Sequence, residues 1–311
     1  MKKILLLFIV ASLTLVSCKN PSKSQHAASE NTVEITHSLG KTHVPLNPER
    51  IVALDFATIE NLNQIGVSII GMPKLAVPAH LKDFESNDEI TNVGSLVEVN
   101  LELINELQPD LIIIGGRLRD SYKSLSRIAP TIITNFDTSD PVGALRKDLE
   151  NLGEIFDKEG EYGDLLIELE HKIDEAQKTI QDSDKKALVV LHNRGRFSAY
   201  GSGSRFGIIH DVLGVQEAAE GLDTHLHGTR ASSEFIKETN PDILFVVDRS
   251  AAIGEQAIDV EIIENELIQR TNAYQNGKII YLNSEAWYLS GTGGIESINM
   301  MVDEIWQAYQ N

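Results

Sequence analysis

Two arginines stand just after buried strands, at matching places in the two halves of the chain. Arg117 follows the apolar run LIII (111–114) and two glycines, and Arg249 follows the run ILFVV (243–247) and an aspartate. Most surface arginines are solvated and contribute little to stability, so this repeated position indicates a role in binding. The formal net charge is −19. An anion-binding site in such a chain requires a local cluster of cationic side chains that outweighs the overall negative field. The two arginines therefore predict an anion-binding site.

A third arginine, Arg205, lies in the glycine-rich segment GSGSRFG (201–207). The segment resembles a nucleotide-binding loop, but its glycines miss the dinucleotide spacing and there is no Walker lysine. We therefore predict a tight turn that presents Arg205, with a helix at 205–213 that Gly214 closes.

Histidines and aromatic residues supply candidate metal ligands. His225 and His227 form an HxH pair that could bind zinc, but no nearby carboxylate or third histidine completes a site. Trp287 and Tyr288 could belong to the core, although large aromatic residues beside glycines in a loop often line a pocket. The chain has no GxSxG motif, and no nucleophile–base pair is evident. We therefore expect a binding protein and not an enzyme.

The N-terminus carries the pattern of an exported protein. Residues 1–17 join two lysines to an apolar run too short for a membrane span, which predicts a secretory signal peptide. Small residues before Cys18 are typical of a bacterial lipobox, which predicts a lipidated Cys18; a plain signal peptide is the alternative. Residues 18–31 are polar and predict a flexible tether. Cys18 is the only cysteine, which excludes disulfides and thiol chemistry in the rest of the chain. The acidic charge argues against nucleic-acid binding.

Buried strands alternate with helices in both halves of the chain. This alternation predicts an α/β fold with largely parallel, covered sheets. We expect the first lobe at residues 32–140, with a hairpin around Gly40 and a strand at 67–71. We expect the second lobe at residues 184–311.

The two lobes carry matching segments. LELINELQPDLIII (101–114) and SEFIKETNPDILFVV (233–247) each place a glutamate at a helix start, a Pro-Asp at its end and a buried strand after it. The match predicts that the second lobe repeats the plan of the first, with a cleft between them. One large doubly wound domain with a chance repeat is the alternative.

Residues 141–183 form a helical segment between the lobes. Within it, apolar residues of KEGEYGDLLIELEHKIDEAQKTIQ (158–181) recur every three or four positions, which predicts one long amphipathic helix. A surface helix or a short coiled coil is the alternative. With matching segments on either side, we interpret it as the helix that connects two lobes.

At these positions the chain resembles the catecholate siderophore-binding lipoproteins of bacterial iron ABC importers, in particular the CeuE-like, enterochelin- and petrobactin-binding group. The resemblance is carried by SRFGIIHDVLG (204–214), SEFI (233–236), NPD with FVVDR (240–249), IIYL (279–282) and WYL (287–289). It covers roughly residues 33–309. It implies the fold of a class III periplasmic binding protein, in which one long backbone α-helix joins two α/β lobes.

The resemblance also implies roles for individual residues. His227 and Tyr288 match the group's two iron ligands. The group's anion-binding arginines are matched by Arg117, Arg205 and Arg249.

Two glutamates match the residues that such proteins present to arginines of the permease. These are Glu102 in the first lobe and Glu234 in the second. Ordinary helix N-terminal charges, favoured by the helix dipole, are the alternative.

Two local segments depart from the group. GGRLRDS carries a second arginine, Arg119, and HLHGTR offers His225 as a competing ligand and Arg230 as an added cation. These differences leave open which residues contact the iron and which siderophore the protein prefers.

The resemblance implies a lipid-anchored monomer with no permanently bound cofactor. It would capture a ferric catecholate-type siderophore in the inter-lobe cleft and deliver it to an ABC importer permease. A bis-catecholate leaves part of the iron's coordination sphere open for an imidazole and a phenolate, and forked arginines can donate to its oxygens. One alternative is the same scaffold binding haem, cobalamin or another siderophore class. An extracytoplasmic metal-dependent hydrolase is a further alternative, and the missing nucleophile motif and incomplete zinc set argue against it.

Overall fold

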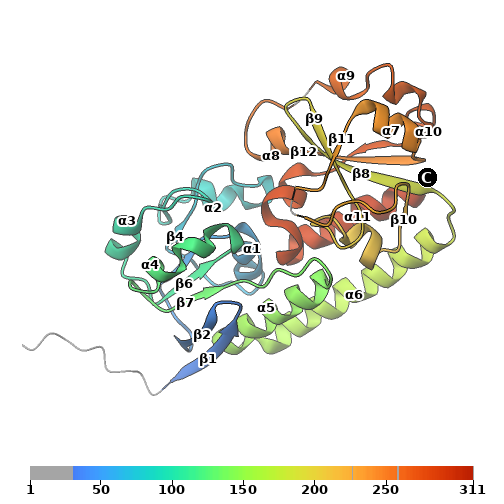
Figure 1. Ribbon diagram of the computed structural model, residues 1–311. Coiled ribbons are helices and arrows are strands. Elements are labelled where there is room, and N and C mark those ends of the chain that lie inside the picture. Colours follow the sequence, from blue (N-terminus) through green and yellow to red (C-terminus); the bar gives the residue numbers. More distant parts are fainter. Residues whose placement is uncertain (1–30, 226, 258, 311) are drawn as a thin grey trace, which may run out of the picture. The chain divides into compact units, whose positions relative to one another are not determined.

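The computed structural model describes residues 31–225, 227–257 and 259–310 (Figure 1). The predicted signal peptide (1–17), Cys18 and all but the last residue of the predicted tether lie outside the described residues. Among the described helices, none is both long enough and apolar enough to cross a membrane. From Thr32 onward the chain forms one compact unit.

The first lobe is built on a five-stranded sheet in the order β5-β4-β3-β6-β7, with every neighbouring pair parallel. Its strands are β3 (Ile51–Ala53), β4 (Gly71–Met72), β5 (Thr91–Asn92), β6 (Leu111–Ile114) and β7 (Thr131–Ile133). All residues of β3, β6 and β7 are buried, as expected for a parallel sheet covered on both faces. The strand predicted at 67–71 is shorter than expected and begins later in the chain. β4 covers only Gly71–Met72. Val67 still donates a hydrogen bond back to Leu62 at the end of the preceding helix, and hydrogen bonds to the neighbouring strands begin at Ile70, which donates to Ile51 O and accepts from Thr91 N.

Helices and a hairpin complete this lobe. The predicted hairpin is present as β1 (Thr32–His37) and β2 (Gly40–Pro45). Helix α1 (Phe56–Gln64) begins after Asp55, and helix α3 (Leu101–Glu106) begins after Asn100; each of these two side chains accepts a backbone N–H of the first turn. The shorter helices are η1 (Ala79–Leu81), α2 (Lys82–Ser86), η2 (Gly116–Ser121) and α4 (Tyr122–Leu125).

The second lobe repeats only part of this plan. Its sheet has the order β11-β9-β8-β12-β13, and β10 also pairs with β8. The strands are β8 (Lys186–Asn193), β9 (Arg196–Tyr200), β10 (Gln216–Glu217), β11 (Thr229–Ala231), β12 (Ile243–Asp248) and β13 (Ile279–Tyr281). β8, β12 and β13 are parallel, like β3, β6 and β7, but β9 runs antiparallel to both β8 and β11. The second sheet is therefore mixed: the expected parallel pairing is present among β8, β10, β12 and β13, and the pairs made by β9 depart from it.

The antiparallel pairing follows from a two-residue turn between β8 and β9. Arg194 and Gly195 both have positive φ, +50° and +80°, as tight hairpin turns require. The predicted helix at 205–213 is also shorter than expected. Ser204 to Gly207 form a tight turn, closed by a 2.9 Å hydrogen bond from Gly207 N to Ser204 O, so helical structure begins only at η3 (Ile208–Val212).

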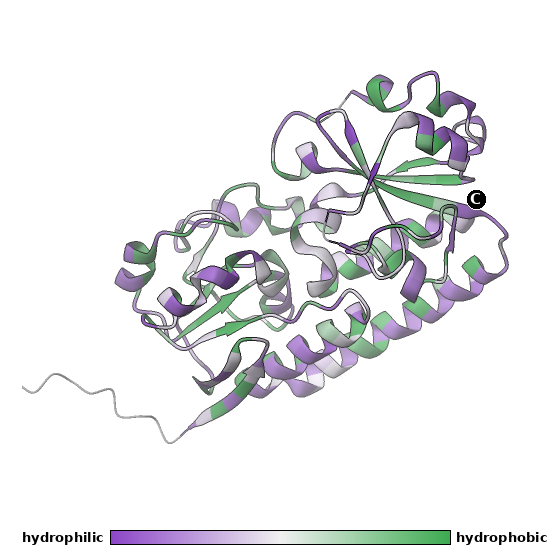
Figure 2. Ribbon diagram, in the orientation of Figure 1, coloured by the Kyte–Doolittle hydropathy of each residue, from purple (hydrophilic) through white to green (hydrophobic). Residues whose placement is uncertain are grey.

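The remaining helices of the second lobe are mostly short. They are α7 (Ser233–Thr239), α8 (Arg249–Ala252), α9 (Val260–Ile263), η4 (Ile268–Arg270), α10 (Asn272–Gln275), η5 (Ala286–Ser290), η6 (Gly291–Gly293) and α11 (Ile295–Gln310). The central strands β8 and β12 of the second sheet are mostly hydrophobic in Figure 2, and nearly all of their residues are buried.

The predicted long helix is α6 (Glu159–Gln181), preceded by α5 (Pro141–Phe156). Its predicted apolar face is buried, with the exception of the half-buried Leu165. α6 contacts both lobes: Tyr162 donates its hydroxyl to the carbonyl of Asn61 in α1, and Gln177 donates to the carbonyl of Val212 in η3. The predicted fold class, two α/β lobes joined by one long helix, is confirmed.

The chain between η5 and α11 is tied directly to α1 of the first lobe. Glu60 is fully buried and accepts hydrogen bonds from the backbone N–H and the hydroxyl of Ser297, over 2.9 and 2.6 Å. Asn61 donates to the carbonyl of Gly293 and accepts from Ile295 N, both over 2.9 Å. The Nε2 atom of His80 lies 2.8 Å from the same Glu60 carboxylate. Two neighbouring residues of the first lobe therefore hold the start of α11.

Candidate functional site

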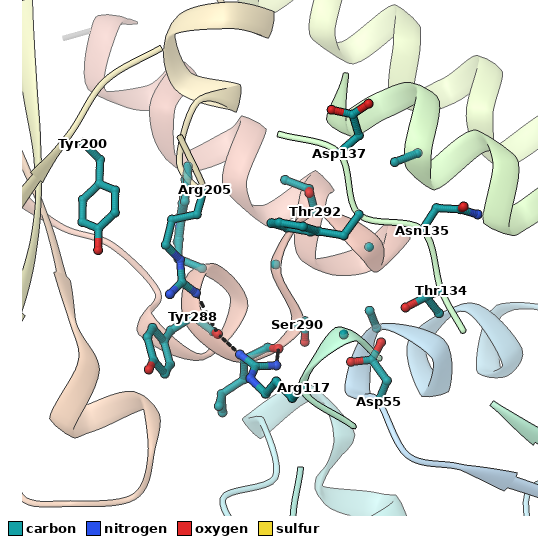
Figure 3. A pocket seen from close by; sticks show the side chains of 18 of the residues that line it. Asp55, Arg117, Thr134, Asn135, Asp137, Tyr200, Arg205, Tyr288, Ser290 and Thr292 are labelled. Carbon is teal, nitrogen blue, oxygen red and sulfur yellow. Dashed lines mark hydrogen bonds between the residues drawn. The ribbon is translucent and has the colours of Figure 1, made fainter. Parts of the chain in front are cut away.

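A cleft of about 1380 Å³ opens where strands of both lobes end. In the first lobe it is lined by residues that follow β3, β6 and β7, including Asp55, Arg117 and Thr134. In the second lobe it is lined by residues at the end of β8 and just after β12, including Asn193 and Arg249. The carboxyl ends of parallel strands are the usual place for ligand sites in α/β sheets. Figure 3 shows labelled side chains of this cleft.

Three arginines surround the ring of Tyr288, which lies in η5. Their guanidinium carbons are 5.9 Å (Arg117), 4.6 Å (Arg205) and 5.6 Å (Arg249) from the ring centroid. Arg249 also donates from Nε to the Tyr288 hydroxyl over 2.8 Å. Cations at such distances are attracted to the face of an aromatic ring. The structure thus brings together four predicted site residues from distant parts of the sequence.

Backbone carbonyls of η5 orient two of these arginines. Arg117 donates to the carbonyls of Tyr288 and Leu289, over 2.6 and 3.0 Å, and Arg205 donates to the Tyr288 carbonyl over 3.4 Å. A guanidinium has five N–H donors, so each keeps further donors for a ligand. Burial lowers the pKa of Arg205, but from so high a value that the side chain stays charged.

The two histidines of the HxH pair lie in different environments. His227 is exposed and lines the cleft. The cleft lining does not include His225, whose side chain is 87% exposed with Nε2 3.8 Å from Asp223. Arg230, in β11, is exposed and is also outside the lining.

Arg119 and Trp287 also line the cleft. Arg119 donates to the hydroxyl of Ser38 over 3.2 Å. Trp287 is only 2% exposed; its indole N–H donates to Glu304 over 2.7 Å, and its ring packs edge-on against Phe206. Trp287 therefore belongs to the core and contributes only part of its surface to the cleft.

The structure adds cleft residues that the sequence analysis missed. Arg194 and Arg196 come from the β8–β9 turn, where Arg194 pairs with Glu255 through both carboxylate oxygens. The sequence signal that could have identified them is the Arg194-Gly195 dipeptide, which is typical of a turn between two strands. Asp55 and Ser290 also line the cleft, and Asp55 follows a buried strand just as Arg249 does.

Cations outnumber carboxylates in the lining. Among the described residues it contains six arginines and one lysine but three aspartates. The lining cations are Arg117, Arg119, Lys147, Arg194, Arg196, Arg205 and Arg249. In a chain with a net charge of −19, this local excess favours an anionic ligand.

Burial raises the pKa of two carboxyl groups toward neutral pH, one after β3 and one in α5. Burial raises the pKa of Asp55 to about 6, against the opposing charge of Arg117. Burial also raises the pKa of Asp148 to about 7, although its carboxylate accepts hydrogen bonds from the backbone N–H and the side chain of Asn135. Only Asp55 lines the cleft.

Glu102 and Glu234 occupy equivalent exposed positions in the first turns of α3 and α7. A hydrogen bond with Ser232, the residue that caps α7, lowers the pKa of Glu234. α3 and α7 each precede a parallel strand of their sheet, so they run back along it and begin near the strand ends that line the cleft. The two glutamates therefore stand on the cleft side of their lobes.

The described residues contain no group of three or more His, Cys, Asp or Glu side chains placed to hold a metal ion. The lining of the cleft combines two tyrosines, one histidine and many guanidinium donors. Such a set suits a metal complex that brings most of its own ligands, and it suits anionic oxygens at that metal.

Comparisons with known proteins agree with this geometry. A family model described as periplasmic binding protein matches residues 51–286. The chain is 42% identical to the petrobactin-binding protein YclQ of Bacillus subtilis over 98% of both chains. It is 37% identical to the ferric-anguibactin-binding protein FatB of Vibrio anguillarum, over 91% of this chain and 89% of FatB.

Solved structures match the fold closely. The crystal structure of YclQ from Bacillus subtilis matches with a TM-score of 0.88, at 40% identity over 91% of this chain and all of the other. The siderophore-binding protein BauB, solved with a complex of two acinetobactin molecules and ferric iron, matches with a TM-score of 0.84. That match has 35% identity over 90% of this chain and 99% of BauB.

Proposed function

We propose that this chain, which belongs to the periplasmic binding protein family, is the substrate-binding component of an ABC importer and captures a ferric catecholate-type siderophore. The observation that carries the proposal is the cluster of Arg117, Arg205 and Arg249 around Tyr288 in a cleft between two α/β lobes. Relatives whose names describe binders of petrobactin and ferric anguibactin support it.

The chemistry of the cleft fits a ferric bis-catecholate. Tyr288 and His227 are hard or intermediate donors that suit positions on ferric iron left open by the siderophore. The three arginines can donate to the anionic catechol oxygens, and each such charge-assisted bond contributes about 1.5–3 kcal/mol. Together these bonds supply a large part of a submicromolar affinity, which corresponds to about 8 kcal/mol. The proposed activity is selective binding of this charged complex, without its chemical conversion.

We also propose how the protein works at the membrane. Lipidation of Cys18 would anchor the exported protein to a membrane, either in a periplasm or at the outer face of the cytoplasmic membrane. Glu102 and Glu234, one on each lobe, would dock on cationic side chains of the permease, since both are exposed in the first turn of a helix.

A fluorescence titration tests the ligand. Trp287 lies at the cleft, so a ferric complex bound there quenches its emission, and Trp287→Phe shows how much of the signal it carries. We expect saturable quenching by a ferric bis-catecholate, with a changed visible iron spectrum, and no response to haem or cobalamin. A response to haem or cobalamin alone would leave the assigned fold unaffected but would show that the ligand is not a ferric catecholate siderophore.

A further inference from the structure

Two carboxylates accept backbone N–H groups of the glycine-rich segment GSGSRFG (201–207). The Glu217 carboxylate accepts from Ser202 N over 2.7 Å, and the Asp211 carboxylate accepts from Gly203 N over 2.6 Å. Successive N–H groups of a glycine-rich turn form a concavity that binds anions, and in nucleotide-binding loops the anion is a phosphate. In this chain the anions are side chains of the protein itself.

The glycines of the segment leave room for these two carboxylates. A Cβ at Gly201 would overlap Oε1 of Glu217, and a Cβ at Gly207 would overlap Oδ2 of Asp211. Gly203, between them, has a φ of +71°, in the region that favours glycine. The glycines that make the segment resemble a nucleotide-binding loop therefore serve contacts within the chain.

The two carboxylates come from different elements of the second lobe. Glu217 lies in β10, where it pairs with Ala187 of β8. Asp211 lies in η3, whose first two residues are buried. The cleft lining includes neither carboxylate. The first half of the segment is thus tied to a sheet and to a helix from outside the cleft.

The second half of the segment is held by aromatic packing. Phe206 is only 1% exposed, and its ring lies edge-on against Tyr200 and Trp287, with centroids 4.8 and 6.0 Å apart. Arg205 therefore projects from a backbone that is held on both sides, by the carboxylates before it and by the packing of Phe206 after it.

Arg205 depends on this backbone more than the other two arginines of the cluster do. Its hydrogen bond to the Tyr288 carbonyl is long, 3.4 Å (Figure 3). By contrast, Arg117 donates to the same carbonyl over 2.6 Å, and Arg249 donates to the Tyr288 hydroxyl over 2.8 Å. The rings of Phe206 and Tyr288, 5.0 and 4.6 Å from its guanidinium carbon, attract the charge but direct it less than a short hydrogen bond would.

We propose that Asp211 and Glu217 are positioning residues for ligand capture, because they hold the segment so that Arg205 faces the cleft before the anionic ligand arrives. The inference rests on the proposed function and names two side chains that raise affinity without touching the ligand. Ordering the arginine in advance lowers the entropic cost of binding. The same contacts occupy the N–H groups of the segment, which are then unavailable to phosphate from solution.

A double-mutant cycle tests whether the carboxylates act through Arg205. Fluorescence quenching gives Kd of a ferric bis-catecholate for the wild-type protein, for Asp211→Ala with Glu217→Ala, for Arg205→Ala and for the triple variant. Asp211→Asn with Glu217→Gln keeps an acceptor oxygen at each position. The matched control is Asp242→Ala, because Asp242 also accepts a backbone N–H, from Lys186 over 3.0 Å, but at the start of β8, away from the cleft. Melting temperatures confirm that each variant folds.

We expect the double alanine variant to raise Kd about tenfold where Arg205 is present. Where Arg205 is replaced by alanine, the same pair of substitutions should change Kd by less than about twofold. Asp211→Asn with Glu217→Gln should keep Kd near the wild-type value, and Asp242→Ala should leave it unchanged. An equal loss with and without Arg205, or no loss in the double alanine variant, would overturn the positioning role. Failure of the wild-type protein to bind would overturn the proposed function itself.

Amide proton resonances of the ligand-free protein check the contacts themselves. A strong hydrogen bond to a carboxylate shifts an amide proton downfield. Glu217→Ala should therefore move the Ser202 amide upfield, and Asp211→Ala should do the same for the Gly203 amide. Each variant removes one side chain that is exposed or half-buried, so this measurement needs neither the double variant nor a siderophore. Amide resonances that stay in place in both single variants would overturn the proposal.

Discussion

Arg249 and Tyr288 are joined by a 2.8 Å hydrogen bond from the guanidinium Nε to the phenol oxygen. The arginine directly follows strand β12 and begins α8, and the tyrosine lies in a short helix near the end of the chain. The bond fixes the oxygen that we propose as an iron ligand. It can persist when that oxygen becomes a phenolate, because a guanidinium donates to a charged oxygen more strongly than to a neutral one.

Tyr288→Phe tests the iron ligand directly. We expect the variant to fold and to lose the visible tyrosinate-to-iron band on binding ferric bis-catecholate, with Kd raised at least tenfold (about 1.4 kcal/mol). Tyr200→Phe is the control, since Tyr200 lines the same cleft and its hydroxyl is paired with Ser198. A band that survives in Tyr288→Phe would show that Tyr288 does not coordinate the iron.

Arg205→Lys tests whether the forked shape of the guanidinium matters. Lysine keeps the charge but loses the planar donors that reach both the Tyr288 carbonyl and a ligand oxygen. We expect a weaker ferric complex by about 1.5–3 kcal/mol, the contribution of one charge-assisted bond, measured by quenching. Arg119→Lys, at the exposed edge beside Ser38, should change Kd less than threefold, within the range of surface contacts. Equal effects in the two variants would assign Arg205 a purely electrostatic role.

The buried carboxyl groups predict how stability depends on pH. Burial raises the pKa of Asp148 to about 7 and that of Asp55 to about 6, so the folded state holds these protons more tightly than the unfolded state. Their contribution is fully present below about pH 4 and is lost as the pH rises through about 6 to 7. We therefore expect these groups to lower the melting temperature between about pH 5 and pH 7.5.

Asp148→Asn is the variant that checks this pH dependence. It should flatten the slope of melting temperature against pH, with a difference on the order of 1–3 kcal/mol across the window. Asp137→Asn is the control, because hydrogen bonds with Ser139 lower the pKa of Asp137 and keep it out of the window. An unchanged slope in Asp148→Asn would contradict the assignment.

Glu102→Arg with Glu234→Arg tests docking to the permease separately from ligand capture. Both residues are exposed on the first turns of α3 and α7, away from the lining of the cleft. We expect ferric-siderophore Kd to stay within twofold and iron uptake by cells to fall at least tenfold, since like charges at a docking surface repel. Glu106→Arg with Glu238→Arg provides exposed controls on the same helices. Equal loss of uptake in both pairs would indicate a general charge effect.

The sequence predicted the long helix and the arginine cluster for physical reasons that are local. The apolar face of α6 repeats over six turns, and such a period admits few alternatives. Arg117 and Arg249 follow fully buried strands, and parallel strand ends converge at one edge of a sheet. For the same reason Asp55 was predictable in principle, because it follows the buried strand β3.

Other features depend on contacts that the sequence does not display. β9 turns back along β8 through Arg194 and Gly195, and the apolar alternation of β9 is compatible with either direction of pairing. Ser290 is one small polar residue among several near glycines, and only the packing of η5 shows that its hydroxyl is buried. The separation of His227 from His225 likewise requires the fold of the intervening loop.

The tie between α1 and the start of α11 has a kinetic consequence. The hydrogen bonds of Glu60 with Ser297 and of Asn61 with Gly293 hold the segment that carries Tyr288 against the first lobe before any ligand arrives. A preformed site needs no slow closing step, so association is limited by diffusion and by steering toward the arginines, and added salt slows it.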